Sequence, residues 1–283
     1  MNPRKSRAAN KIIAKEADVE AALGKQFGRT IKVQYGCLPE GTYARCLHRM
    51  AAVSTPTPVA SLAGQTVTAL HTPPLTLRLP NGEVLLADTP LHIAPGDSVL
   101  IRGPSGCGKS TLMRVLAGIW PAVSSASADG LPVALPQGSL FMPQRPYFPE
   151  GSLRQALTYP DAQVHHSDEE LQQALRDALL PQLVNQLDTE GRWTQLLSGG
   201  EQQRLSMARV LLKRPRWVFA DEATSALDEA AETALYQQLQ ALVQAQGGAL
   251  VSIAHRPGVA AFHQTQWVFT PAPEGSVAKY VLT

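Results

Sequence analysis

The spacing of apolar residues changes along the chain, and each change marks an expected element. Continuous apolar runs at residues 97–102, 139–142, 216–222 and 249–254 are typical of short buried strands. Elsewhere apolar residues recur every three or four positions, which predicts amphipathic helices. One buried helix face is expected at Leu171, Ala174, Leu175, Ala178 and Leu179, and a long helix is expected through Ala230, Leu235, Leu239 and Leu242. Strand, helix and strand in that order favour parallel pairing, and hence an α/β fold.

Two regions depart from this alternation. Residues 75–79 and 84–86 are apolar segments on either side of Pro80-Asn81-Gly82-Glu83, a combination that predicts a β-hairpin. A further short strand and turn at residues 91–97 extend it into an antiparallel layer. From about residue 151 to residue 187 the pattern is helical, which predicts a small helical subdomain.

The N-terminal part of the chain differs from the rest and carries no recognisable motif. Residues 8–23 have helical composition, and residues 51–74 are rich in Thr, Pro, Ala and Ser, as linkers are. We therefore expect a basic extension and linker, partly disordered, at residues 1–60. A folded domain follows at residues 61–283, with its helical subdomain at about 150–205.

Charge and hydropathy limit the classes of partner. The first fifty residues hold ten Lys and Arg against four Asp and Glu, and the remainder holds fifteen against nineteen. A basic head could contact anionic lipid or nucleic acid, although a solvated extension is the simpler interpretation. No run approaches the roughly 18 to 20 apolar residues of a membrane-spanning helix, and the N-terminus lacks the apolar core of a secretory signal.

One segment carries a specific chemical signal. The sequence Gly103-Pro104-Ser105-Gly106-Cys107-Gly108-Lys109-Ser110, here called the phosphate loop, lies between a predicted strand and a predicted helix at residues 111–117. Glycines let the backbone curl until several N–H groups point at one anion, and the helix start favours phosphate. Lys109 is placed to reach the β and γ phosphates, and the hydroxyl of Ser110 to complete a Mg²⁺ shell. We expect ATP-binding contacts from Gly103, Pro104, Ser105, Gly106, Cys107, Gly108, Lys109, Ser110 and Thr111.

The three cysteines indicate a reducing compartment. Cys107 lies inside the phosphate loop, where a disulfide would obstruct nucleotide binding. Cys37 and Cys46 lack the close spacing of zinc ligands, so we interpret them as ordinary thiols.

A second acidic signal follows the apolar run at residues 216–222. This run ends in Asp221 and Glu222, at the end of a strand where open α/β sheets place their chemistry. We expect Asp221 to hold Mg²⁺ through water and Glu222 to act as the general base toward the attacking water.

The segment Leu197-Ser198-Gly199-Gly200-Glu201, here called the signature segment, gives a second helix start that suits an anion. It matches the diagnostic signature of the ABC ATPase superfamily, and the chain resembles that family's nucleotide-binding cassette across roughly residues 75–270. The resemblance implies a P-loop NTPase fold with a RecA-like parallel-sheet core, an antiparallel β layer and a helical subdomain. It also implies a head-to-tail dimer, in which each signature segment caps the ATP that the other copy holds.

The resemblance assigns roles to further residues. Gln144 is similar to the Q-loop glutamine that senses Mg²⁺ and the γ-phosphate, so Mg²⁺ contacts are expected from Ser110, Gln144 and Asp221. Ser225, Ala226, Leu227 and Asp228 resemble the D-loop at the dimer seam. His255 resembles the switch histidine, and together with Glu222 and Gln144 it completes the expected catalytic set.

The chain departs from the family pattern at the adenine site. The family often stacks an aromatic ring on adenine, yet no Phe, Tyr or Trp lies between Met50 and Trp120. Leu79 occupies the equivalent place, and an aliphatic contact, His71 or a residue from elsewhere could cover the base.

Within the superfamily, the chain is similar to subfamily D and its bacterial relatives, which include acyl-CoA and cobalamin transporters and cassettes fused to peptide-uptake membrane domains. Pro143-Gln144-Arg145-Pro146-Tyr147, Gly151-Ser152-Leu153-Arg154 before Tyr159-Pro160, and His255-Arg256-Pro257 with His263 carry this likeness. Such proteins usually place the membrane domain in the same chain, so here the membrane subunit is separate or the chain is a shortened product.

The sequence therefore predicts the Mg²⁺-dependent ATPase subunit of an ABC membrane transporter, located in the cytoplasm at the membrane face. Its expected partners are a second cassette and a membrane domain, and the cargo is left open. The alternative is a soluble ABC ATPase acting on nucleic acid or ribosomes, with the basic head as its contact. A degenerate cassette without turnover is a third possibility, although every residue expected for hydrolysis is present.

Overall fold

The computed structural model describes residues 68–79, 81–117, 123–124, 135–161 and 164–283. All of them belong to one compact unit of the chain, residues 58–283. The predicted helix at residues 8–23, the linker, Cys37 and Cys46 lie outside the described residues. The predicted boundary near residue 60 stays a prediction.

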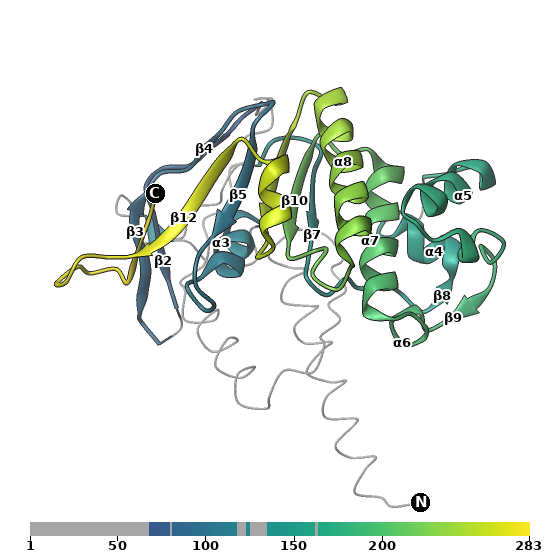
Figure 1. Cartoon of the computed structure of the whole chain (residues 1–283), viewed down its shortest axis with the longest axis horizontal. Helices are drawn as coiled ribbons and strands as arrows, with labels where there is room; N and C mark the ends of the chain where they lie inside the picture. Colours follow the sequence, from purple (N-terminus) through teal and green to yellow (C-terminus); the bar gives the residue numbers. More distant parts are fainter. Residues whose placement is uncertain (1–67, 80, 118–122, 125–134, 162–163) are drawn as a thin grey trace, which may run out of the picture. The chain divides into compact units, whose positions relative to one another are not determined.

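A six-stranded sheet forms the centre of this unit, in the order β13-β12-β5-β11-β10-β7 (Figure 1). Its strands are β5 (Ser98–Arg102), β7 (Ser139–Met142), β10 (Trp217–Asp221), β11 (Ala249–Ile253), β12 (Thr265–Pro271) and β13 (Tyr280–Leu282). All neighbours pair in parallel except β12 and β13. The predicted parallel α/β fold is confirmed.

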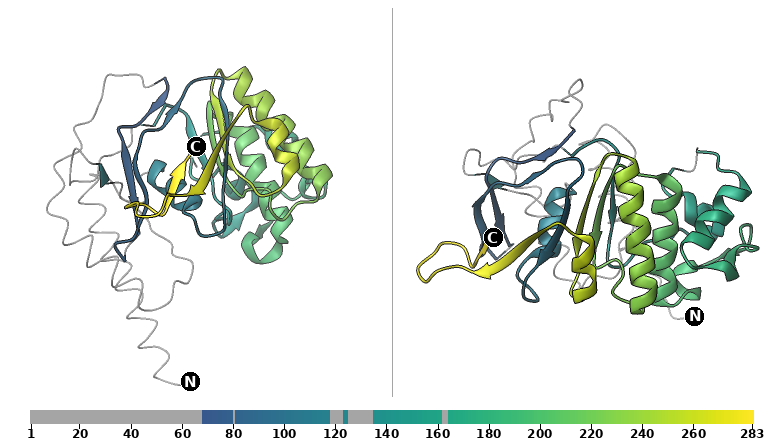
Figure 2. Two further views of the ribbon diagram at one scale, coloured as in Figure 1. Left: turned by 60° about the vertical axis from the view of Figure 1, so that its left-hand side comes forward. Right: turned by 45° about the horizontal axis from the view of Figure 1, so that its top comes forward.

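The two faces of this sheet carry two separate hydrophobic clusters, because successive side chains of a strand point to opposite faces. On β10, Trp217 and Phe219 belong to one cluster, whereas Val218 and Ala220 belong to the other. The helix α3 (Lys109–Leu116) packs into the first cluster. The helices α7 (Gly199–Lys213) and α8 (Glu229–Ala245) pack into the second, so they cover the opposite face (Figures 1 and 2).

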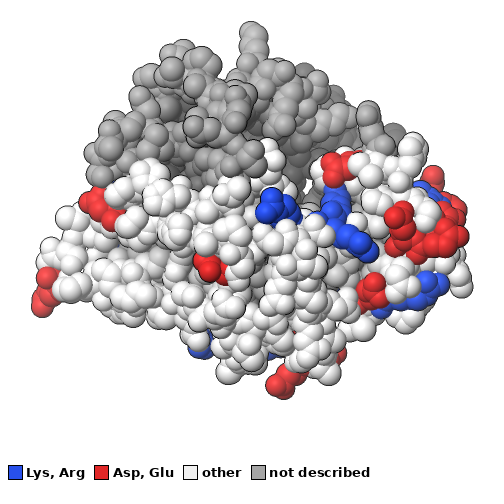
Figure 3. Space-filling model, turned by 90° about the horizontal axis from the view of Figure 1, so that it is seen from above, with Lys and Arg blue, Asp and Glu red and all other residues white. Residues whose placement is uncertain are grey.

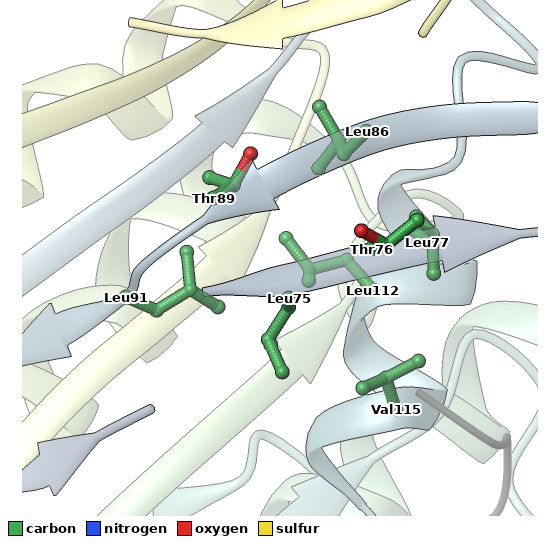
Figure 4. Close-up of a pocket in the computed structure, with 8 residues that line it drawn as sticks. All are labelled: Leu75, Thr76, Leu77, Leu86, Thr89, Leu91, Leu112 and Val115. Carbon is green, nitrogen blue, oxygen red and sulfur yellow. The ribbon is translucent and has the colours of Figure 1, made fainter. Parts of the chain in front are cut away.

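The predicted antiparallel layer lies beyond α3. The strands β2 (Leu75–Arg78) and β3 (Val84–Thr89) form the expected hairpin, and β6 (Val123–Ser124) pairs with β2. A second pair joins β1 (Leu70–His71) to β4 (His92–Ile93). Leucines of β2 and β3 meet Leu112 and Val115 of α3 around a small apolar pocket (Figure 4). The layer therefore holds α3 from the side that the central sheet leaves open.

The helical subdomain contains more than helices. Its helices are α4 (Leu153–Thr158), α5 (Asp168–Asp177), the short 3₁₀ helix η1 (Pro181–Leu183) and α6 (Trp193–Leu196). The expectation of helix from residue 151 onward is wrong at its start, because β8 (Gly151–Ser152) pairs with β9 (Glu190–Gly191). The reason is capping: the Ser152 hydroxyl accepts from Gln155 N, which keeps Ser152 extended as the N-cap of α4.

We expect a sharp difference between two adjacent glycines after α8. A Cβ at Gly248 would lie 1.5 Å from the carbonyl oxygen of Arg216, so Gly248→Ala must move backbone between β10 and β11. Gly247 has a left-handed φ of 59° and nothing within 4 Å of an added Cβ, so Gly247→Ala should cost only about 1–2 kcal/mol. Urea unfolding of both variants checks this expectation, and equal losses would contradict the close approach at Gly248.

Candidate functional site

The phosphate loop connects β5 to α3 at the carboxyl edge of the parallel sheet. Gly103 and Gly108 have positive φ values of 150° and 106°. A Cβ at Gly103 would lie 2.7 Å from Phe269 Cβ, and one at Gly108 would lie 2.6 Å from Leu85 Cδ1. Both positions therefore require glycine for conformation and for space.

The first turn of α3 has no side-chain cap and no acidic residue. Its backbone N–H groups therefore keep the donors and the positive end of the helix dipole that an anion needs. Nothing lies within 4 Å of a Cβ added at Gly106, so the loop is open there. These features suit a phosphate group.

Lys109 lies folded against its own loop and is 6% exposed. Its Nζ donates to the carbonyl oxygens of Gly103 at 3.0 Å and Pro104 at 2.9 Å. The third donor of Nζ has only the sulfur of Cys107, at 4.0 Å, as its acceptor. Sulfur is a weak acceptor, so a phosphate oxygen would be a stronger partner for this buried ammonium.

Ser110 and Asp221 meet across the end of the sheet. Ser110 Oγ donates to Asp221 Oδ1 at 3.0 Å. Burial raises the pKa of Asp221, the bond from Ser110 lowers it, and the negative charge of Glu222 raises it again. A half-buried carboxylate beside a hydroxyl offers the hard oxygen ligands of Mg²⁺, and a cation there would oppose the effect of burial. The donor set therefore fits a magnesium ion.

Glu222 is held between two other predicted site residues. Gln144 Nε2 donates to Glu222 Oε2 at 2.7 Å, and His255 Nε2 lies 3.0 Å from Glu222 Oε1. These three residues come from the end of β10, the segment after β7 and the segment after β11, which are neighbouring strands of one sheet. The predicted catalytic set is thus gathered beside the Ser110–Asp221 pair.

The backbone of Glu222 is strained. Its φ of 48° lies in the left-handed region, which costs a non-glycine residue of order 1–3 kcal/mol. Glu222 N donates to Ile253 O at 3.0 Å, and Glu222 O accepts from Ser225 N at 3.2 Å. The surrounding bonds therefore fix a conformation that the residue would not otherwise prefer.

The signature segment begins α7 with a reciprocal cap. Ser198 Oγ accepts from Glu201 N, and the Glu201 carboxylate accepts from Ser198 N at 3.0 Å. The hydrogen bonds from Ser198 hold the pKa of Glu201 below its ordinary value. A Cβ at Gly200 would lie 3.1 Å from the carbonyl oxygen of Ala226, so this glycine permits a close approach of α7 to the D-loop.

The phosphate loop and the signature segment do not meet in one chain. The helices that they begin, α3 and α7, pack on opposite faces of the sheet. The nearest neighbours of an added Cβ at Gly199 and Gly200 are Ala226 and Leu227, and none belongs to the phosphate loop. A ligand that touches both segments therefore needs a second copy.

The D-loop leads from Glu222 into α8. Asp228 caps this helix, because its Oδ1 accepts from Ala231 N at 2.8 Å, and that bond lowers the pKa of Asp228. Arg256, directly after His255, donates to the carbonyl oxygens of Leu227 at 2.5 Å and Ser225 at 3.3 Å. The segment that carries His255 and the D-loop are thus tied together.

Three further residues, to which sequence analysis assigns no role, hold these segments together. Gln203 of α7 bonds to the D-loop, and Arg256 does so from the other side. Arg209 Nη1 donates to Tyr147 O at 2.8 Å and its Nε to Ala156 O at 2.6 Å, which joins α7 to the segment after Gln144. Burial lowers the pKa of Arg209 to about 10. All three come after motif residues in the sequence, but their structural role is visible only in their hydrogen bonds to distant segments.

The residues considered for the adenine contact differ in their surroundings. Leu79 is half-buried against the antiparallel layer, and His71 is exposed with its Nδ1 3.4 Å from Nδ1 of His92. His263 is buried instead, with its ring nitrogens 2.9 Å from Val259 O and Ser252 Oγ, so it is a core residue.

Comparison with known proteins relates this chain to ABC transporters. Residues 86–225 match the family model described as ABC transporter. An "Uncharacterized ABC transporter ATP-binding protein" of Haemophilus influenzae is 40% identical over 185 residues, which cover 65% of this chain and 30% of that protein. The mouse "Lysosomal cobalamin transporter ABCD4" is 40% identical over 194 residues, with 65% and 31% covered. A bacterial Atm1-family ABC exporter with ATP bound superimposes with a TM-score of 0.60 at 26% identity, covering 71% of this chain and 37% of the exporter chain.

The chain spans less than a third of the length of these two curated relatives. Over the described ranges between residues 68 and 283, no helix combines the length and the hydropathy of a membrane span.

Replacing Ser198 by Ala should remove the hydroxyl that accepts from Glu201 N and donates to the Glu201 carboxylate at 2.7 Å, and should lower stability by about 1 kcal/mol at neutral pH. The pKa of Glu201 is lowered from 4.5, so above pH 4.5 the ionised carboxylate adds to the free energy of unfolding. This added stability is lost as the pH falls through the lowered pKa. The stability difference between wild type and Ser198→Ala, measured by urea unfolding at pH 7 and at pH 3.5, should therefore shrink in acid.

The matched control is Ser167→Ala, which removes the same kind of cap from α5, away from the site. It should cost a similar amount at pH 7. A Ser198→Ala variant as stable as wild type would contradict the capping geometry of the signature segment.

Proposed function

Because the chain contains an ATP-binding domain of the ABC transporter family, we propose that it hydrolyses ATP as a head-to-tail pair of copies coupled to a membrane domain. The observation that carries this proposal is the Glu222 carboxylate, which Gln144 and His255 hold beside the Ser110–Asp221 pair. A site that only binds nucleotide has no need of a second, oriented carboxylate at that place.

The phosphate loop binds the triphosphate in this proposal. The open N–H groups of α3 and the buried Nζ of Lys109 donate to phosphate oxygens, and Lys109 gives up neutral carbonyls for charged acceptors. Ser110, Asp221 and Gln144 would hold Mg²⁺, which when bound neutralises phosphate charge. We also propose that Leu79 or His71 covers the base.

Glu222 accepts the proton of the attacking water. Each of its oxygens already accepts one bond, and a carboxylate oxygen has a second lone pair for that water. Gln144 and His255 orient the carboxylate of Glu222. When nucleotide binds, their side chains would leave that carboxylate and bond to the γ-phosphate instead. His255 is 54% exposed at its side chain, so it has room for this movement.

A second copy supplies the missing lid. The signature segment, at the start of α7, offers another set of helix donors, and in one chain these face its own D-loop rather than its phosphate loop. Two copies related by a two-fold axis would each place Ser198, Gly199 and Gly200 on the other's triphosphate. The D-loop, Ser225 to Asp228, would then lie at the seam.

The membrane domain is the proposed partner that receives the motion, and the cassette would lie at the cytoplasmic face of the membrane. The relatives named as transporters support this assignment. We also propose that residues 1–60 form an extension and residues 61–283 form the cassette, with the helical subdomain at about 150–205.

The soluble alternative uses the basic head, residues 1–50, as its contact, and these residues lie outside the part of the chain that the structure describes. On the face in Figure 3, basic and acidic side chains are mixed rather than gathered into one basic patch. Arg154 pairs with Asp168 and Asp188, and Lys213 pairs with Asp161, so these cations are already neutralised. A surface that tracks a phosphate backbone needs uncompensated positive charge.

Replacing Glu222 by Gln should slow ATP hydrolysis by about 10²- to 10⁴-fold, because the amide cannot accept the proton. Binding of Mg-ATP should change little, since the phosphate loop is intact. Single-turnover phosphate release and calorimetric titration measure the two quantities.

Lys109→Ala provides the contrast, because it removes a donor to the triphosphate. That variant should lose nucleotide affinity itself. Unchanged turnover in Glu222→Gln would refute the general-base role, and unchanged affinity in Lys109→Ala would remove that lysine from the site.

A further inference from the structure

Gln203 is a buried polar side chain of the helix that begins at the signature segment. It lies in the first turns of α7, five residues after Ser198, and is 5% exposed. Burying a primary amide is costly unless its donors and acceptor are paired. The hydrogen-bond partners of Gln203 therefore indicate its structural role.

Every partner of Gln203 belongs to the turn that follows Glu222. Its Oε1 accepts from Ala226 N at 2.8 Å, and its Nε2 donates to Ser225 Oγ at 3.1 Å and Glu222 O at 3.3 Å. Because a backbone N–H can only donate, Ala226 fixes which way round the amide lies. Both ends of the side-chain amide are thus used on one short turn.

The turn that Gln203 holds is the strained one. Glu222 has a φ of 48°, and such a conformation persists only where the surroundings fix it. Gln203 binds the carbonyl oxygen of Glu222 itself and the two residues that close the turn. It therefore helps to set the direction in which the Glu222 carboxylate points.

Gln203 and the glycines of the signature segment belong to one helix, α7. α7 is a continuous helix from Gly199, and a Cβ added at Gly200 would lie only 3.1 Å from the carbonyl oxygen of Ala226 in the D-loop. A shift of the D-loop is therefore transmitted to the start of α7 through Gln203, and the reverse holds as well.

We propose that Gln203 is a positioning residue that links the two nucleotide sites of the paired cassettes. This inference rests on the proposed head-to-tail pair, in which Glu222 serves the ATP of its own copy and the signature segment serves the ATP of the other. Gln203 then joins the general base of one site to the lid of the second within a single chain.

The first test uses the full nucleotide-free chain and amide hydrogen exchange. Gln203→Leu keeps the approximate volume and removes the acceptor, so exchange of the Ala226 amide should rise by on the order of tenfold. Gln203→Glu keeps an oxygen for Ala226 N and should raise it less. Gln237→Leu, on the exposed side of α8, is the matched control and should change nothing at Ala226.

The second test uses paired copies of defined composition, in which one copy carries Glu222→Gln. The remaining hydrolytic site then combines Glu222 of the intact copy with the signature segment of the altered copy. Gln203→Leu should lower kcat by on the order of tenfold when placed in either copy, while KM for ATP stays within about twofold.

Three outcomes overturn the inference. Unchanged exchange at Ala226 removes the contact, unchanged kcat in both placements removes the positioning role, and loss of kcat only when Gln203→Leu lies in the intact copy removes the link between sites. The exchange test decides the contact even where wild type fails to hydrolyse ATP, an outcome that would refute the proposed function instead.

Discussion

The placement of two helix starts on opposite faces of one sheet is the constraint on which the rest depends. Alternating side chains of β5, β10 and β11 divide the core into two clusters, with α3 in one and α7 in the other. Both helix starts suit an anion, yet one chain cannot bring them to the same phosphate. This separation is the basis of the proposal that a second copy supplies the signature segment to the bound triphosphate.

A pair of copies would need its two sites to be coupled, and the contacts around Glu222 offer a physical basis for that proposed coupling. Glu222 stands at a strained junction between β10 and the D-loop, and residues from three elements hold that junction. Strain that is fixed by long-range bonds can be released when a ligand offers better partners. In the proposed mechanism, Gln144 and His255, which both bond to Glu222, would hold the carboxylate in its direction until phosphate competes for them.

Much of this was accessible from the sequence, because the informative signals are local. The strands at β5, β7, β10 and β11, the hairpin of β2 and β3 and the helix α8 follow from runs, periodicity and turn chemistry within a few residues. The phosphate loop and the signature segment are likewise short motifs. The gathering of Gln144, Glu222 and His255 follows once parallel pairing of their strands is assumed.

The remaining features depend on distant contacts that local pattern does not contain. The pairing of β8 with β9 joins segments about forty residues apart through two short, half-exposed strands. The strand β12 fully buries only Phe269, so it lacks the continuous buried run of β5, β10 and β11. Gln203, Arg209 and Arg256 are polar residues within helices or loops, and their polarity alone would predict contact with solvent. Their bonds to backbone carbonyls of other segments reverse that expectation.

The most direct test of the shared site is sedimentation velocity of the Glu222→Gln chain at several concentrations, with and without Mg-ATP. The account predicts monomers without nucleotide and a dimer with it, and the dimer should be lost when Gly200 is also replaced by a bulky residue such as Gln. A Mg-ATP complex that stays monomeric at high concentration, or a dimer indifferent to Gly200, would contradict the claim that two copies share the triphosphate.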